Sequence, residues 1–371
     1  MRPDVVERLR EAMEADDLQA VVAISPENFA YLTGFVVPSQ PLMRWRHAMA
    51  LVAREGPGTL VAVDMEASTV RERAGDTPVR TWGEFSDDPM ETLAEALAAA
   101  GLAGGRIGLE FKYLPAGDFQ SLARRLPGAT FVPVDATLDR LRQAKSGEEI
   151  ALLRRLARIA DRAISDAFRA VRAGSSELEL AAALTGSVYA QGAEQFKLMI
   201  VATGERSRLP NVGPSERRLQ PGDVCRVEIF PVIGGYHAGV CRTAVVERAP
   251  PEAARIYANL AECRAELLRA LRPGASTRGI YEAFLARFGE LGLPPISFVG
   301  HGIGLHLHEE PYLGPYSDQP LAAGNVLGVE PLVYDTGQGF GLQIKDMVAI
   351  TEPGCELLSD VTDATELFVI G

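Results

Sequence analysis

The chain has 371 residues, of which 47% are hydrophobic and 23% are charged, as in an ordinary globular protein. This length predicts about two domains, each large enough to bury a core. The net charge of -12, without any block of Lys and Arg, argues against a nucleic-acid partner.

Short apolar runs alternate with helical patterns over the first 135 residues. Val5, Leu9 and Met13 recur at helical spacing in a charged, amphipathic opening segment. Apolar runs typical of buried strands follow at 20–25, 48–54, 59–64 and 131–135. The segment 95–111 reads as a helix, a Gly-rich stop and a further strand at its end. This alternation predicts an α/β domain with a mixed or parallel sheet.

A second domain is predicted after the segment 138–148, where the sequence becomes rich in charged residues. Ser146 followed by Glu149 has the spacing of a capping box and predicts a long helix. Ser176 and Glu179 predict the start of a second helix in the same way. The expected division is an N-terminal domain at 1–137, a linker at 138–148 and a catalytic domain at 149–371.

The second domain is expected to pair long helices with β segments. Helical patterns cover 252–272 and 276–291, and two strands are expected on either side of the turn at 233–235. We find no internal repeat in the sequence. The predicted fold class is therefore α/β (α+β).

Cysteine spacing and hydropathy exclude several further classes. The chain has no CxxC pair, which argues against a zinc ribbon, a redox dithiol or a disulfide framework. The opening segment lacks the apolar centre of a secretion signal, and no run of about 18 apolar residues is present. A cytoplasmic protein with no membrane partner is expected.

Unusual polar residues lie within apolar β segments of the second half. His301, His306 and His308 fall within eight residues, although the chain has only five histidines. Three charged residues are embedded in apolar runs: Glu228, Glu330 and Lys345. Such charges are costly to bury unless paired, so they are expected to lie near one another or near water. A solvent-facing strand position would explain any one of them, but explains the whole set less well.

Several segments in this order resemble the creatinase, aminopeptidase P and prolidase family. GHGIGLHLHEEP (300–311) is similar to the His-containing motif of the family, and 222–243 is similar to its double strand ending in Arg-Thr. The later VEPLV and IKD segments, and PENFAYLTGF and LRQAKSGEEI nearer the N-terminus, also resemble it. The resemblance implies a small creatinase-like N-terminal domain, a C-terminal pita-bread domain and a homodimer.

The resemblance also implies a metal site, from which this sequence departs. Metal-dependent members bind two divalent ions through two Asp, one His and two Glu. The corresponding positions here are Glu228, Gly239, His301, Glu330 and Lys345. Two of the four carboxylates are lost, and an ammonium group replaces one of them. The remaining negative charge of the ligands is too small to balance two divalent cations, which need anionic oxygen ligands.

We therefore expect no metal and no other cofactor. A single ion on Glu228, His301 and Glu330 stays possible, because three protein ligands can suffice. Lys345 would repel such an ion if its ammonium group entered the same cavity.

The predicted function is a metal-independent, creatinase-related hydrolase that cleaves an amide or amidine-type C–N bond in a small, polar, amino-acid-like molecule. Glu330 or Glu228 would activate the water. Lys345 would polarise the carbonyl or stabilise the oxyanion. His301 and His308 would move the proton to the leaving nitrogen. Each histidine also has a non-catalytic interpretation. His301 could be a hydrogen-bonded residue that only fills space in the site, and His308 could be an ordinary core histidine.

Five further residues are candidates for substrate binding: Arg46, Asn211, His237, Cys241 and Arg242. In creatinase an arginine corresponding to Arg46 is thought to reach the substrate carboxylate across the dimer, but a surface pair beside Trp45 is the alternative. Cys241 could be a nucleophile or a small buried hydrophobe. His237 could simply be a turn residue.

Creatine itself does not fit as the substrate. Asn211 stands where creatinase and the prolidases share a histidine, and Asn cannot act as a general acid or base. Two alternatives remain: a metal-dependent Xaa-Pro dipeptidase or aminopeptidase, and a non-catalytic binding protein of the same fold.

Overall fold

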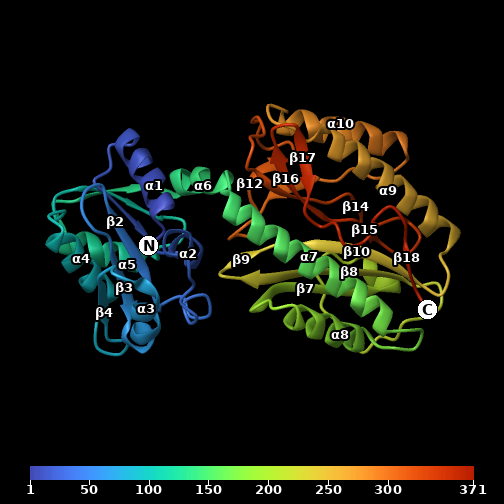
Figure 1. The fold of residues 1–371 in the computed structure, drawn as a ribbon, viewed down its shortest axis with the longest axis horizontal. Coiled ribbons are helices and arrows are strands. Elements are labelled where there is room, and N and C mark those ends of the chain that lie inside the picture. The colour runs from blue at the N-terminus through green and yellow to red at the C-terminus, as the bar shows by residue number, and fades with distance from the viewer. The chain divides into compact units, whose positions relative to one another are not determined.

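The computed structural model describes residues 1–371, and the chain divides into two compact units, Met1–Arg142 and Gln143–Gly371 (Figure 1). The segment expected to be a linker, 138–148, is largely helical. It contains the end of α6 (Asp135–Gln143) and the first residues of α7 (Gly147–Ala170). Charged residues there favour a solvated helix surface as readily as a loop.

The N-terminal unit is a six-stranded mixed sheet in the order β4-β3-β2-β1-β5-β6. Strand β1 pairs antiparallel with β2 and parallel with β5. The strand direction therefore changes between β1 and β2, near the centre of the sheet. The strands are β1 (Ala20–Ala23), β2 (Met49–Ala53), β3 (Thr59–Val63), β4 (Val79–Trp82), β5 (Arg106–Leu109) and β6 (Thr130–Pro133).

Helices alternate with these strands along the chain and complete the unit. They are α1 (Pro3–Ala15), α2 (Pro26–Thr33), α3 (Ala67–Ala74), α4 (Pro89–Ala99) and α5 (Ala116–Arg125). Val5, Leu9 and Met13 form the buried face of α1, as their spacing predicts. The α/β prediction for this domain is confirmed.

The C-terminal unit contains two five-stranded sheets, each covered by a pair of helices. One sheet has the order β18-β10-β8-β7, with β9 (Tyr236–His237) attached to β8, and the other has the order β12-β11-β13-β16-β17. In Figure 1, α8 lies below β7 and β8, whereas α9 and α10 lie above β14 and β15.

The bounds of these elements are as follows. The helices are α7, α8 (Glu177–Ala190), α9 (Pro251–Ala270) and α10 (Thr277–Glu290). The first sheet uses β7 (Gln195–Thr203), β8 (Val224–Ile233), β10 (Val240–Val246) and β18 (Phe368–Ile370). The second uses β11 (Gly300–Gly302), β12 (Glu309–Leu313), β13 (Val326–Val329), β16 (Asp346–Thr351) and β17 (Gly354–Leu357). A small ladder joins β14 (Leu332–Val333) to β15 (Leu342–Gln343).

The helix starts in this unit follow the local sequence signals. Ser146 and Glu149 form a reciprocal capping box at α7, and Ser176 and Glu179 form another at α8. Each box satisfies two backbone N–H groups that would otherwise lack an intrahelical partner. Both predicted capping boxes are confirmed.

The two helix pairs repeat the same local structure, although no repeat was predicted from the sequence. Gly174, between α7 and α8, donates its N–H to Leu219 O at 2.8 Å. Gly274, between α9 and α10, donates to Leu321 O at 2.8 Å. The shared sequence signal is a short Arg-x-Gly-x-Ser pattern, too brief to stand out without the structure.

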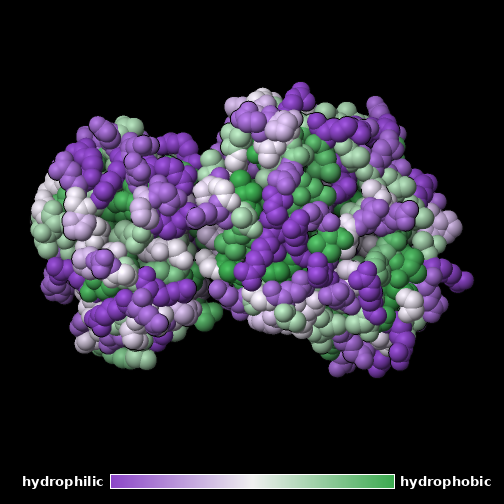
Figure 2. Space-filling view, in the orientation of Figure 1, coloured by the Kyte–Doolittle hydropathy of each residue, from purple (hydrophilic) through white to green (hydrophobic).

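Hydrophilic side chains cover the outer surface of α7 and are bordered by hydrophobic patches (Figure 2). The opposite face of α7 packs on the sheet and carries its buried residues. No helix in the structure combines the length and apolar character needed to cross a bilayer.

Candidate metal centre

The polar residues singled out in the sequence meet between the two sheets of the C-terminal unit. Cys241 on β10 and Lys345, just before β16, exchange backbone hydrogen bonds of 3.2 and 3.1 Å. This bridge brings β8, which carries Glu228, close to the second sheet, which carries His301. Glu330 directly follows β13, so its carboxylate enters the same space.

Lys345 lies between the two buried glutamates. Its ammonium nitrogen is 3.1 Å from Glu228 Oε1 and 3.3 Å from Glu330 Oε2. The lysine is only 2% exposed, and each glutamate is 4% exposed. The expectation that Lys345 is buried against Glu228 or Glu330 is confirmed, since it contacts both.

This charge cluster shifts the ionisation of its members. Burial alone would raise the pKa of Glu330, but the Lys345 ammonium outweighs it and holds the pKa well below its usual range. Burial alone would lower the pKa of Lys345, whereas the two carboxylates raise it above its normal value. Glu330 and Lys345 are therefore expected to stay charged while they remain in contact.

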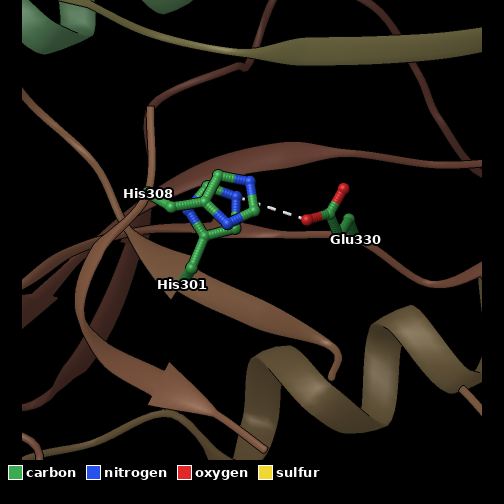
Figure 3. A group of neighbouring side chains, drawn as sticks. All are labelled: His301, His308 and Glu330. Atoms are coloured by element: carbon green, nitrogen blue, oxygen red, sulfur yellow. Dashed lines mark ion pairs between the residues drawn. The ribbon is translucent and has the colours of Figure 1, made fainter. Parts of the chain in front are cut away.

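His301 and Glu330 present two facing acceptors. His301 Nδ1 lies 2.8 Å from Gly302 O, and a carbonyl can only accept, so Nδ1 carries the proton and Nε2 keeps its lone pair when the ring is neutral. Nε2 lies 3.2 Å from Glu330 Oε1 (Figure 3). Both atoms are buried and have no hydrogen-bond partner. Two such acceptors repel each other unless a proton or a metal ion lies between them.

His308 completes the group. Its ring stacks on that of His301 with centroids 3.7 Å apart and planes 10° apart, as Figure 3 shows. Burial, together with the nearby Lys345 ammonium, lowers the pKa of His308 to about 4. The ring is therefore neutral near pH 7, which is the form that binds metals.

These three side chains offer ligand atoms for one metal ion, and the stacked His308 ring has to rotate before its lone pair points at an ion beside His301. One ligand atom from each of His301, His308 and Glu330 can be chosen so that all lie within 4.8 Å of one another. Two ligands that are each about 2.1 Å from a tetrahedral ion lie about 3.4 Å apart, close to the observed His301–Glu330 separation. The two oxygens of Glu330 have separate tasks, because Oε2 contacts Lys345 and accepts a 3.0 Å hydrogen bond from Gln343.

A second ion does not fit beside the first. A Cβ atom at Gly239 would lie 2.1 Å from the Phe230 ring, so no carboxylate side chain can occupy that position in this arrangement. The Lys345 ammonium lies 4.9 Å from the centre of the same ring and already occupies the space between the two glutamates. Phe230 and Lys345 together fill the place where further ligands would have to converge.

Two of the predicted substrate-binding residues are buried and already surrounded by protein groups. Arg242 is buried, and its donors are used by Asp161, Asp346, Thr362 and nearby carbonyl groups. It holds the sheets together and leaves no donor for a substrate. Cys241 is fully buried, which raises the pKa of its thiol well above its normal value and favours the alternative of a small buried hydrophobe.

The other three predicted residues differ in their setting. His237 is buried, its Nε2 has no partner, and burial lowers its pKa to about 4. Asn211 is exposed in the loop after β7. Arg46 lies in the N-terminal unit, where Glu84 accepts two hydrogen bonds from its guanidinium at 2.7 and 2.8 Å.

Several contributors to the site carried no clear signal in the sequence. Gln343 connects Glu330 to the buried Arg226, whose Nη1 donates to Gln343 Oε1 at 3.0 Å. Phe230 sits in an apolar run, where an aromatic ring is ordinary. The buried pair Lys145 and Glu309 joins residues far apart in the chain. Only the three-dimensional arrangement reveals these partners.

Comparison with known families identifies the fold. The model of the metallopeptidase family M24 matches residues 151–352, and the creatinase/prolidase N-terminal domain matches residues 6–144. The chain belongs to metallopeptidase family M24. The resemblance to the pita-bread enzymes, the fold class and the assignment as a hydrolase of C–N bonds are therefore confirmed.

Relatives cover almost the whole M24 chain. The Xaa-Pro dipeptidase of Pyrococcus horikoshii is 26% identical, over 95% of this chain and 96% of the relative. The probable dipeptidase PepE of Mycobacterium tuberculosis is 29% identical, over 91% of this chain and 86% of the relative.

Solved structures agree with this placement. The dipeptidase PepE of Mycobacterium ulcerans superposes with a TM-score of 0.85 at 28% identity, covering 99% of this chain and 97% of that one. The prolidase of Pyrococcus horikoshii superposes with a TM-score of 0.84 at 26% identity, covering 97% of this chain and 99% of that one.

These comparisons correct the expectation of a metal-independent, creatinase-like hydrolase. M24 is a family of metallopeptidases, and the relatives named above are dipeptidases. The group formed by His301, His308 and Glu330 also offers metal ligands, so the expectation of no cofactor is wrong. The comparisons match the alternative reading, a metal-dependent Xaa-Pro dipeptidase.

Proposed function

We propose that the protein is a metal-dependent dipeptidase that hydrolyses short peptides, Xaa-Pro dipeptides in particular, in the cytoplasm. The observation that carries the proposal is the pair of facing, unpartnered acceptors on His301 and Glu330, with His308 beside them. The names of the relatives support the choice of substrate. The four cysteines are free thiols, which supports the location.

His301, His308 and Glu330 would hold one divalent ion. A bound ion supplies Lewis acidity toward the scissile carbonyl. With neutral imidazoles, two carboxylates and one ammonium give this cluster a net charge of -1. One divalent ion changes the net charge to +1, which suits a substrate that carries one carboxylate.

The other residues of the cluster provide proton transfer and orientation. Glu228 is the one carboxylate of the cluster that would not bind the ion. It would accept the proton of the attacking water and pass it to the leaving nitrogen. Lys345 contacts both carboxylates and holds Glu228 beside Glu330. Gly302 O fixes the ring of His301 so that Nε2 faces Glu330.

The proposal is tested by comparing peptides with one inactive variant. The purified protein should release proline from Xaa-Pro dipeptides and leave creatine intact. Glu330→Gln keeps the shape of the side chain but removes its charge, and should lower kcat/KM by roughly 100-fold or more. Equal release of proline by the wild type and by this variant would refute the assignment.

We also propose a homodimer that uses the N-terminal unit. Leu42, Trp45 and Phe85 are 81%, 63% and 95% exposed. The Arg46–Glu84 ion pair brings together the two segments that carry Trp45 and Phe85. Covering such residues stabilises an interface by about 1.5–3 kcal/mol for each fully buried side chain.

Light scattering at micromolar concentration should give twice the mass of the chain. Replacing Trp45 and Phe85 with serine should produce a monomer without changing the melting temperature of either unit by more than a few degrees, because both side chains are exposed. Arg46→Ala should raise KM if the arginine reaches a substrate carboxylate in the dimer. A monomeric wild type would contradict the homodimer.

A further inference from the structure

We propose that Lys145 and Glu309 are positioning residues that hold the histidine loop, residues 303–308, so that His308 joins His301 and Glu330. The inference rests on the proposed metal-dependent function. It concerns a buried ion pair whose two side chains are not among the three ligands.

The pair is short and removed from solvent. Lys145 Nζ lies 2.8 Å from Glu309 Oε2, and the two side chains are 2% and 4% exposed. Burying both charges is expensive, so a pair kept at this depth needs good geometry and further hydrogen bonds. Glu309 provides one, because its Oε1 accepts a hydrogen bond from the N–H of His306 at 3.1 Å. One carboxylate thus connects a fixed cation to the backbone of the histidine loop.

The backbone of Lys145 is anchored to the strand that leads to Glu330. The N–H of Lys145 donates to Gly324 O at 2.9 Å, and Ala144 forms an isolated bridge with Asn325. Asn325 immediately precedes β13, and Glu330 immediately follows it. Lys145 therefore connects the histidine loop to the same strand that delivers the carboxylate ligand.

The lysine stem also fits closely against the loop. A Cβ atom at Gly304 would lie 3.2 Å from Lys145 Cε and 3.3 Å from Glu309 Oε2. Gly304 O accepts a 2.9 Å hydrogen bond from the N–H of His237, which holds the loop from its other side. The loop is fixed by these contacts before any ion binds.

His308 depends on this support more than the other ligands do. Its side chain is exposed, and it has ring contacts with His301, Phe298 and Tyr312 but no hydrogen bond to hold its orientation. His301 and Glu330 are buried within the sheet. A shift of the loop backbone would therefore displace His308 first.

The test uses cobalt(II), whose visible absorption reports the number and geometry of its ligands. Lys145→Met should weaken cobalt(II) affinity by roughly 10- to 100-fold and change the absorption bands. Glu310→Gln is the matched control, because this neighbouring carboxylate accepts hydrogen bonds from Tyr312 and Gln319 and does not contact the lysine. It should leave affinity and spectrum unchanged.

A second variant separates positioning from simple stabilisation. Lys145→Met with Glu309→Gln removes the uncompensated buried charge, so the melting temperature of the metal-free protein should recover toward that of the wild type. Cobalt(II) affinity should stay low, because the connection to the lysine is still missing. Recovery of affinity and spectrum together with stability would overturn the positioning role.

The outcomes also separate this inference from the proposed function. If wild-type protein binds no cobalt(II), the proposed function fails and the inference fails with it. If wild-type protein binds cobalt(II) and Lys145→Met binds it with the same affinity and spectrum, only the inference fails.

Discussion

Removing the bound divalent ion should lower the hydrolysis of Xaa-Pro dipeptides by roughly 1,000-fold or more, since the ion contributes several kcal/mol of transition-state stabilisation. Chelation followed by dialysis should produce this loss. Adding back one equivalent of a divalent transition metal per chain should restore activity. Elemental analysis of the active protein should find one ion per chain, because Phe230 and Lys345 fill the space for a second.

His308→Ala is the informative variant for this experiment. Its side chain is exposed and makes no hydrogen bond, so the variant should fold normally. It should nevertheless lose most of its affinity for the ion, because two protein ligands remain in place of three. Full activity after exhaustive chelation would contradict the proposed function. Two tightly bound ions per chain would contradict the one-ion geometry.

Replacing Lys345 with methionine should reduce the free energy of unfolding by about 3–5 kcal/mol. The variant leaves the carboxylates of Glu228 and Glu330 close together without the ammonium that now lies between them. Their mutual repulsion and burial must then be relieved by protonating one of them or by unfolding. Chemical denaturation followed by circular dichroism measures the change.

Lys112→Met is the control for this change, because the Lys112 side chain is 76% exposed and its contact with Asp139 is a surface ion pair. It should alter stability by less than about 0.5 kcal/mol. A divalent ion should stabilise Lys345→Met more than it stabilises the wild type, since the ion replaces part of the missing positive charge. A Lys345→Met variant within 1 kcal/mol of the control would refute the role assigned to this lysine.

Features set by local chemistry could be predicted from the sequence. The helix caps at Ser146 and Ser176 depend on residues three positions apart. The pairing of Lys345 followed from the cost of burying an isolated charge, although the sequence did not say that it would contact both Glu228 and Glu330.

Features that depend on distant partners could not be predicted. Glu309 finds Lys145 across 164 positions, and no local pattern indicates which buried carboxylate a lysine will meet. The Phe230 ring blocks the space beside Gly239, so returning the family's carboxylate there would need a second change at 230. The expectation of a metal-free site counted ligands position by position. It did not consider that His308 stacks on His301 and offers a further ligand atom near Glu330.

The exposure of His308 has a consequence for how quickly the ion exchanges. Two ligands are buried in the sheet, while the third is held by ring stacking at the open edge. Side chains at such edges change rotamer within nanoseconds, far faster than a sheet opens. If an ion is held here, His308 is the ligand that could leave it without disturbing the sheet, so the exchange rate of the ion would be set by this one side chain.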